Sequence, residues 1–513
     1  MFRLNNIDIT YESFIMAVFN QDMPLPANSI STIPLHIFQT WHSLDMPPHM
    51  KDCVDSIKRD NPEFTHHLFD DESCRKLLHE KFPPEVLHAY NSLLPGAYKA
   101  DLWRYCVLYT YGGIYLDIKL RCKSFKLLSL TTREHYVRDR DYHYNSGVYQ
   151  ALLVSYPKNP IFYECIQKIV HYVRTLEYGD TVLYIGPVLM ASFFTRAEIM
   201  SWDMHFNGKQ ILWGETPILE TYPEFIQDFT DCSKTAYYME SWAFRKVYGL
   251  FSPPPLKRTE LTRSINKHFL TGVQHIDDTL YFKWSDELFL EQGEYTPPTN
   301  TLISRVRINE AYEFMGEVES IGVDTLSFTA FKHDELYYLI SNHETYKLIG
   351  DSTVELTTLF TRKSTEPLWA TFIYDGELNF VYQWYPLLLT KNVNGNIKPH
   401  TVFYDTPRFF KSLEASTHGV VYKGQIWFIL TKVQHFIFRA VYKKFSHLFV
   451  VFDSRMKLLK YSEFFVMDNS PVSRISDFHM KDTITIGYST YHGKCFISEH
   501  AYDDIQKMRW TYH

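Results

Sequence analysis

Two different rhythms of hydrophobic and polar positions divide the chain near its middle. From about residue 33 to residue 250, short apolar runs that suit strands alternate with segments in which apolar residues recur at helical spacing. The predicted strands cover residues 33–41, 64–70 and 114–120, and the predicted helices cover residues 50–60, 71–80 and 95–111. Strands that alternate with helices are typical of a mostly parallel sheet with helices on both faces, so we expect an α/β domain here.

The second half of the chain instead repeats one short sequence motif. After about residue 260 a turn pair, a polar residue and then a Leu or Ile that opens a strand recur five times. The strand-opening residues are Leu280, Leu336, Leu378, Ile426 and Ile484. Repeats at about the length of a four-stranded blade, roughly 40–50 residues, are typical of a β-propeller. We predict a five-bladed propeller over residues 256–513 and an α/β domain over residues 1–255; a β-sandwich with similar hairpins is the alternative for the second half.

Composition limits the kind of protein this is. The 513 residues carry a formal net charge of −7, which argues against general binding of nucleic acid, although a local basic patch stays open. Hydrophobic residues make up 45% and charged residues 22%, as in a globular chain with an ample core. The aromatic share of 17% is unusual, and it suits both strands and sugar-binding surfaces.

The sequence predicts neither secretion nor a membrane span. No run of about 18 apolar residues occurs, and residues 1–20 lack a basic stretch followed by a sustained apolar one. The seven cysteines form no Cys-x-x-Cys pair, and an odd, scattered set fits a reducing compartment. We therefore expect a cytoplasmic or otherwise intracellular protein.

The most informative chemistry lies between residues 100 and 119. Asp101 and Arg104 are three positions apart on a predicted helix and so share a face. Gly112 and Gly113 end that helix and let the chain turn sharply. Along the strand that follows, three polar side chains alternate with apolar ones and point to the same side: Tyr115, Asp117 and Lys119.

Such a group of side chains can hold a phosphorylated sugar. Carboxylates accept hydrogen bonds from sugar hydroxyls, while Arg and Lys bind phosphate oxygens. Ligands of open α/β sheets also bind at the ends of strands. The alternative is an ion-pair network on a solvated sheet edge, and the residues alone do not choose between the two.

The order of these motifs resembles the DxD-type sugar-binding glycosyltransferases, a family that includes the yeast initiating α-1,6-mannosyltransferase and, more distantly, the glucosylating domains of large clostridial toxins. That family opens with an Ile-Pro-x-x-Ile-His-Gln-Thr-Trp strand, and residues 33–41 read Ile-Pro-Leu-His-Ile-Phe-Gln-Thr-Trp. The family's later motifs are Asp-x-x-Arg, Gly-Gly-x-Tyr, the first DxD acid, an Asn before a Gly and, in part, Thr-Gly-Pro. They are met by Asp101, Arg104, Gly112, Gly113, Tyr115, Asp117, Asn145, Gly147, Gly186 and Pro187. The match covers roughly residues 30–250.

The resemblance implies a Rossmann-like fold of the GT-A type and a retaining glycosyltransferase. Such an enzyme moves a hexose from a UDP- or GDP-sugar to a glycan or protein-linked acceptor. It also implies that Trp41 lies against the nucleobase. The implied nucleotide-sugar-binding residues are Trp41, Asp101, Arg104, Tyr115, Asn145 and Gly147. The implied catalytic residues are Asp117, Arg104 and Lys119, with Asp117 as the metal ligand.

At the position of the second acid of the DxD pair this chain has Lys119. This departure leaves open whether the enzyme needs a metal ion. Two carboxylates on one strand face can hold a hard cation against the diphosphate, whereas a protonated lysine repels a cation. In one interpretation Asp117, with Asp139 or Asp141, still recruits Mn²⁺ or Mg²⁺. In a second, Lys119 itself neutralises the leaving diphosphate. In a third, the enzyme is degenerate.

The predicted propeller resembles those of glycoside hydrolases and mannoside phosphorylases. We expect it to bind the glycan acceptor; a second transferase or hydrolase site and a scaffold are the alternatives. Hydrolysis needs two carboxylates across a cleft, and the candidate acids are Glu366, Asp375 and Asp453. Trp369, Trp384 and Tyr385 either stack on sugar or fill the blade cores.

Three functions for the whole chain follow from these patterns. The first is a nucleotide-sugar-dependent glycosyltransferase with an appended propeller. The second is a catalytically lapsed domain that binds carbohydrate or assists assembly. The third is a propeller glycosidase whose first half only positions the substrate. A cytosolic or virus-encoded polysaccharide pathway fits the absence of a secretory signal.

Overall fold

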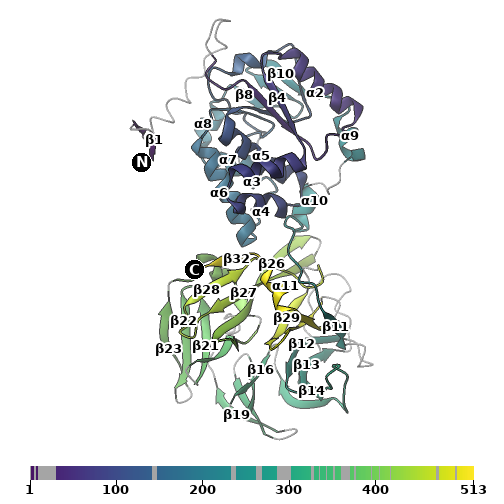
Figure 1. The fold of residues 1–513 in the computed structure, drawn as a ribbon, viewed down its shortest axis with the longest axis vertical. Coiled ribbons are helices and arrows are strands. Elements are labelled where there is room, and N and C mark those ends of the chain that lie inside the picture. The colour runs from purple at the N-terminus through teal and green to yellow at the C-terminus, as the bar shows by residue number, and fades with distance from the viewer. Residues whose placement is uncertain are drawn as a thin grey trace. The chain divides into compact units, whose positions relative to one another are not determined.

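The chain separates into two compact units, residues 1–249 and residues 250–513 (Figure 1). The predicted boundary after residue 255 lies a few residues further along the chain. The computed structural model describes residues 2–4, 7–9, 31–140, 147–232, 238–261, 269–285, 302–324, 328–333, 336–341, 344–349, 353–359, 370–374, 377–393, 396–403, 405–415, 417–438, 440–469, 473–490 and 494–513.

The first unit contains two four-stranded sheets and a short hairpin. One sheet has the order β4-β3-β5-β7, in which β3 runs parallel to β4 and β5 while β7 is antiparallel to β5. The other sheet is antiparallel and has the order β6-β10-β9-β8. The strands are β1 (Phe2–Leu4), β2 (Ile7–Ile9), β3 (His36–Thr40), β4 (Thr65–Phe69), β5 (Gly113–Leu116), β6 (Leu120–Cys122), β7 (Leu152–Ser155), β8 (Met204–Phe206), β9 (Gln210–Trp213) and β10 (Thr216–Thr221).

Helices surround these sheets, and their ends follow local sequence signals. Helix α2 begins with a proline in its first turn, and Asp70 caps α3 by accepting a hydrogen bond from the Ser73 N–H at 2.8 Å. The helices are α2 (Pro48–Asp60), α3 (Asp71–Lys81), α4 (Pro84–Ser92), α5 (Gly96–Tyr111), α6 (Pro160–Thr175), α7 (Pro187–Ala191), α8 (Arg196–Met200), α9 (Phe225–Cys232), α10 (Tyr238–Ala243) and the 3-10 turn Leu127–Leu130. The predicted helices at 50–60, 71–80 and 95–111 correspond to α2, α3 and α5, whereas α4 was not predicted.

The strand predicted over residues 114–120 is shorter than expected. Strand β5 ends at Leu116, and a turn closed by a hydrogen bond from the Leu120 N–H to the Asp117 carbonyl separates it from β6. Helix α5 packs on one face of β5 and side chains of the second sheet pack on the other, so both faces are covered and Tyr115 is buried. The predicted polar face of this strand was therefore wrong, although its polar residues still meet.

The main core of the first unit lies between its two sheets. Apolar side chains of β3, β5 and β7 pack against side chains of β8, β9 and β10 in one buried cluster. Its central members include Ile37, Ile114, Leu116, Val154 and Ile211. This core fixes β5, and β5 in turn fixes the residues that follow it.

The second unit, within the described residues, is built from five antiparallel sheets. Their orders are β11-β31-β30-β29, β12-β13-β14-β15, β16-β17-β18-β19, β20-β21-β22-β23 and β24-β26-β27-β28-β32, with β25 also paired to β26. The strands are β11 (Lys257–Glu260), β12 (Phe269–Ile276), β13 (Thr279–Ser285), β14 (Leu302–Arg307), β15 (Glu319–Asp324), β16 (Phe328–His333), β17 (Leu336–Ser341), β18 (Glu344–Ile349), β19 (Thr353–Leu359), β20 (Ala370–Tyr374), β21 (Glu377–Trp384), β22 (Leu387–Val393), β23 (Asn396–Phe403), β24 (Glu414–Ala415), β25 (Val420–Tyr422), β26 (Gln425–Phe438), β27 (Ala440–Phe452), β28 (Leu458–Ser462), β29 (Arg474–Met480), β30 (Ile484–Ser489), β31 (Cys495–His500) and β32 (Trp510–Tyr512). Helix α11 (Tyr502–Gln506) and the 3-10 turn Arg408–Ser412 complete the unit.

The five copies of the repeated sequence motif fall at the same place in each of the five sheets. Each one forms the turn of a hairpin: β12–β13, β16–β17, β20–β21, β25–β26 and β29–β30. The strand-opening residues all lie in the second strand of their hairpin. The repeat in the sequence is thus a repeat in the structure, with one copy for each sheet.

The first strands of neighbouring sheets contact one another. Strand β12 packs against β29 and β30 on one side and against β16 on the other, and β25 packs against β29. The Gly419 N–H donates to the Thr371 carbonyl at 2.7 Å, which joins the segment before β25 to β20. Strand β11, from the start of the unit, pairs with β31 near its end. Five such sheets in contact are what a five-bladed propeller requires, and the propeller stays our interpretation of them.

None of the seven cysteines is part of a disulfide. Among the residues that the structure describes, no helix is long and apolar enough to cross a membrane.

Candidate active site

Five of the predicted site residues lie together where strand β5 ends. Helix α5 packs against β5 and carries Asp101 and Arg104, both of which are buried. Gly112 ends the helix with a φ of 65°, a left-handed conformation that glycine adopts without strain. Strand β5 then runs back through the sheet and brings Tyr115 and Asp117 to the polar side chains of the helix.

The carboxylate of Asp117 is the meeting point of this cluster. Its Oδ1 accepts a hydrogen bond from the Tyr115 hydroxyl at 2.9 Å and lies 3.5 Å from Nη2 of Arg104. Its Oδ2 lies 3.0 Å from Nζ of Lys119. The side chains of Asp117 and Lys119 are 22% and 24% exposed, so a ligand can reach both groups from solvent.

Arg104 is held in one orientation by partners on several sides. Its Nη1 lies 2.9 Å from Oδ1 of Asp101 and donates to the Gln150 carbonyl at 2.8 Å. Its guanidinium lies over the ring of Tyr115, 4.5 Å from the ring centre. A guanidinium with so many fixed partners is preorganised, since little rotamer freedom is left to lose when an anion binds.

Burial and neighbouring charges set the protonation states of the cluster. Burial raises the pKa of Asp101 to about 6, although Arg104 opposes the shift. Burial would also raise the pKa of Asp117, but Lys119 and Arg104 outweigh it and hold that pKa below its ordinary value. Burial opposes the charge of Lys119, yet Asp117 keeps the lysine's pKa above its ordinary value. At neutral pH, Asp117 is therefore an anion between two cations.

Of the remaining predicted ligand residues, the structure describes Trp41 and Gly147. Trp41 follows β3 and packs against an apolar group that includes Ile118, and its buried indole N–H has no hydrogen-bond partner among the described residues. The carbonyl of Gly147 accepts a hydrogen bond from the Asp139 N–H at 2.9 Å. Asn145 and Asp141 lie outside the described residues, so their predicted roles stay predictions.

Several residues of the site were not predicted from the sequence. The backbone at Gly186 packs so closely on Asp101 that a Cβ there would lie 2.7 Å from the aspartate Cγ. Gln150 supplies its carbonyl to Arg104, and its side chain accepts a hydrogen bond from the Tyr105 hydroxyl at 2.7 Å. Backbone carbonyls carry no sequence signal, but the Gly-Pro pair at 186–187 was a visible hint of close backbone approach.

A divalent cation, which the DxD motif implies, fits this donor set poorly. Both oxygens of Asp117 already face cations or a hydroxyl donor, and Lys119 replaces the second acid. The buried carboxylate of Asp139 accepts a hydrogen bond from the Arg140 N–H at 2.8 Å. Within the described residues no set of three His, Cys, Asp or Glu side chains gathers around Asp117 at ligand distances.

The acids and aromatic residues proposed for the second unit have more ordinary surroundings. Asp453 caps a turn by accepting hydrogen bonds from the N–H groups of Arg455 and Lys457. Trp384 is buried and packs against Phe428 and Phe452, so it belongs to the sheet core. Glu366, Asp375 and Trp369 lie outside the described residues.

Comparison with known proteins supports the first unit's resemblance. Residues 47–130 match the family described as "Glycosyltransferase sugar-binding region containing DXD motif". An inositol phosphoceramide mannosyltransferase of Schizosaccharomyces pombe is 31% identical over 188 residues, which are 34% of this chain and 53% of that protein. The initiation-specific α-1,6-mannosyltransferase of Candida albicans is 28% identical over 18% of this chain and 26% of that protein. The chain spans about half the length of the first of these relatives and about a quarter of the second.

Among solved structures, one similar protein belongs to a family of mannoside phosphorylases that contains glycoside hydrolases acting on β-1,2-mannosidic linkages. The likeness covers 50% of this chain and 92% of that one, with a TM-score of 0.35 and 11% identity, values too low to bear on function.

The segment that matches the family model, residues 47–130, holds helix α5, strand β5 and the whole Asp117 cluster. The predicted resemblance to the sugar-binding region of the DXD-motif glycosyltransferases is therefore confirmed for the segment that builds this site.

Proposed function

We propose that the first unit transfers a hexose from a nucleotide-sugar donor to a hydroxyl of a glycan or protein-linked acceptor, with retention of configuration at the anomeric carbon. The observation that carries the proposal is the convergence of Arg104 and Lys119 on Asp117 at the end of β5. Mannose is the first sugar to test, because the relatives that match this segment are named as mannosyltransferases.

The two cations would act on the leaving group. During transfer the bond between the anomeric carbon and the donor phosphate oxygen breaks, and the acceptor oxygen bonds to that carbon. The acceptor loses its proton, and the nucleoside diphosphate leaves with the electron pair of the broken bond. Positive groups already fixed beside that oxygen stabilise its developing charge, and removing one such group typically costs about 10²–10³-fold in rate.

The two carboxylates would hold the sugar. Asp101 and Asp117 can accept hydrogen bonds from sugar hydroxyls, and their contacts with Arg104 hold them in place. We propose that Lys119 takes the place of the metal, so that turnover does not require Mn²⁺ or Mg²⁺. The second unit, as a five-bladed propeller, would bind the acceptor glycan.

The first experiment is a panel of UDP- and GDP-sugars tested by thermal shift and by donor hydrolysis, with EDTA and with added Mn²⁺. We expect one donor to raise the melting temperature and to be hydrolysed slowly, with little effect of EDTA. Asp117→Ala should abolish hydrolysis, because Lys119 then loses the group that positions it and the sugar loses a carboxylate that would bind its hydroxyls. Asp45→Ala, which changes an exposed carboxylate of the same unit, is the matched control.

The outcomes separate the competing functions. Unchanged hydrolysis in Asp117→Ala would place the reaction elsewhere in the chain. Hydrolysis that stops in EDTA and returns with Mn²⁺ would replace the lysine mechanism with metal assistance. A chain that responds to no donor would favour the lapsed, carbohydrate-binding function.

A further inference from the structure

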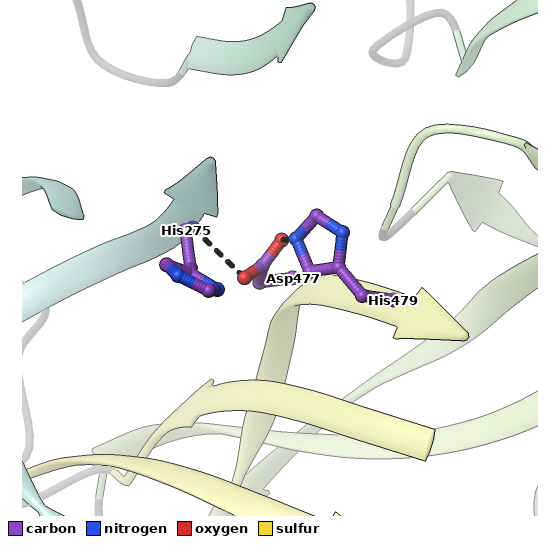
Figure 2. Close-up of side chains that lie close together, drawn as sticks. All are labelled: His275, Asp477 and His479. Atoms are coloured by element: carbon purple, nitrogen blue, oxygen red, sulfur yellow. Dashed lines mark hydrogen bonds and ion pairs between the residues drawn. The ribbon is translucent and has the colours of Figure 1, made fainter. Parts of the chain in front are cut away.

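A second polar cluster lies in the other unit, far along the chain from any predicted site residue. His275 is at the end of β12, while Asp477 and His479 occupy alternate positions of β29 and so point to the same face (Figure 2). Asp477 is 1% exposed, and the two imidazoles are partly buried. Burial of a carboxylate is costly unless the group is paired and hydrogen-bonded, so the neighbours of Asp477 decide its energetic cost.

The three side chains already lie close together. Oδ2 of Asp477 accepts a hydrogen bond from the His275 backbone N–H at 2.8 Å, and Oδ1 lies 3.0 Å from Nε2 of His479. One ligand atom from each residue can be chosen so that all three lie within 4.8 Å of one another. Zinc bonds of about 2.0–2.2 Å place neighbouring ligands roughly 3.3–3.5 Å apart, so metal binding would draw the three side chains closer together. Nε2 of His275 lies 2.5 Å from the Asp277 carbonyl, so the ring would keep this contact or exchange it for the metal.

The cluster opens onto a cavity of about 450 Å³. Residues from all five sheets or from the segments beside them line this cavity, among them Lys332 of β16, Thr371 of β20 and His418 before β25. The buried hydroxyl of Thr371 has no hydrogen-bond partner among the described residues. The ring of His418 lies 5.4 Å from that of His479, which adds a third imidazole to the wall. A small ligand therefore has space beside the cluster, and the Thr371 hydroxyl is there to bond it.

We propose that His275, Asp477 and His479 bind a divalent transition-metal ion of the zinc class, with at least one coordination position open to the cavity. Two imidazole nitrogens and one carboxylate oxygen form a donor set that suits zinc, whereas Ca²⁺ and Mg²⁺ prefer oxygen ligands only. The ligands come from two sheets, and the open position faces the space where a hydroxyl or carboxylate oxygen of a bound molecule would complete the coordination.

The test measures metal content in the full-length chain. The protein is stripped with EDTA, equilibrated with Zn²⁺, and analysed for bound zinc; the same protein is loaded with Co²⁺, whose visible spectrum reports nitrogen and oxygen coordination. We expect one equivalent of zinc in the wild type, and at least a 100-fold loss of affinity in His275→Gln and in His479→Gln. Ca²⁺ and Mg²⁺ should not compete at millimolar concentration.

Two controls make the result specific to this cluster. His49→Gln changes another histidine that lies 3.4 Å from an aspartate, Asp228, and it should keep the zinc. Asp117→Ala should also keep it, which separates this site from the first unit. His275→Gln is the decisive variant, because its side chain is partly exposed and its hydrogen bond to Asp477 uses the backbone. The substitution also removes the contact of the ring with the Asp277 carbonyl, which is why folding of the variant is checked. If both glutamine variants are folded by circular dichroism and still bind one equivalent, or if the wild type binds none, the proposal is overturned.

Discussion

At the scale of single residues, the site depends on one substitution in a familiar pattern. Where a DxD motif has a second acid, this chain has Lys119, whose Nζ lies 3.0 Å from Oδ2 of Asp117. The lysine converts a pair of carboxylates, which would attract a cation, into an ion pair with no net charge. Arg104, fixed by Asp101 and the Gln150 carbonyl, adds a second cation beside it.

Removing the positive charge of Lys119 tests this view directly. Lys119→Met should lower donor hydrolysis by about 10²–10³-fold, because the leaving diphosphate loses a preorganised cation. Added Mn²⁺ should not restore the rate. Lys123→Met, which changes an exposed lysine paired with Glu220, should leave the rate unchanged. Steady-state hydrolysis of the preferred donor measures both, and a Lys119→Met enzyme with wild-type turnover would refute the role of the lysine.

At the scale of secondary-structure elements, the sequence predicted the parts of the site better than their arrangement. Asp101 and Arg104 were placed correctly on one helix, because helical spacing is local. Asp117 and Lys119 were predicted to share a strand face, but they meet across a turn, since β5 ends at Leu116. The alternation of apolar residues could not reveal this break, because residues on either side of it are buried in any case.

Contacts between distant elements were the part that the sequence could not supply. The approach of Gly186 to Asp101 and the meeting of His275 with Asp477 each join residues far apart in the chain. No spacing rule links such residues, because their distance is set by how sheets and helices pack. Local motifs therefore revealed the first site, and only the folded chain revealed the second.

A substitution at Gly186, the residue before helix α7, tests how closely the backbone must approach Asp101. Gly186→Ala would place a methyl group against the carboxylate of Asp101, although the backbone φ of −107° is acceptable for alanine. We expect a loss of about 1–3 kcal/mol in stability and weaker donor binding, because either Asp101 or the helix must move. Denaturant unfolding and isothermal titration with the donor measure the two effects. An alanine variant with unchanged donor affinity would show that Asp101 tolerates displacement.

At the scale of the whole molecule, the second unit is closed by strands from both of its ends. Strand β11 pairs with β31, so the sheet that holds Asp477 contains residues from the beginning and from the end of the unit. Arg258 on β11 stabilises this pairing of strands. Its guanidinium contacts the Tyr488 hydroxyl at 2.9 Å and Asp468 at 2.6 Å, and it lies 3.7 Å from the centre of the Phe496 ring.

Loss of the Arg258 contacts should destabilise the second unit. Arg258→Ala removes the stacking and two hydrogen bonds of a partly exposed side chain, for which we expect about 1–2 kcal/mol. Lys257→Ala is the matched control, since that lysine lies 3.9 Å from Glu499 and is half exposed. Denaturant unfolding of the full chain, with both variants side by side, measures the difference. Equal midpoints for the two variants would show that β11 is held by its backbone alone.

The closure of the second unit by β11 has a consequence for how the protein is made. Residues 1–249 leave the ribosome first and contain all the strands of their own sheets. Strand β11 follows, but its partner β31 is translated only some 240 residues later, a delay on the order of ten to fifty seconds at ordinary synthesis rates. During that delay β11 has no partner strand, and His275, although β12 pairs with β13, has not yet met Asp477. The second unit can complete its fold only after β31 has been synthesised.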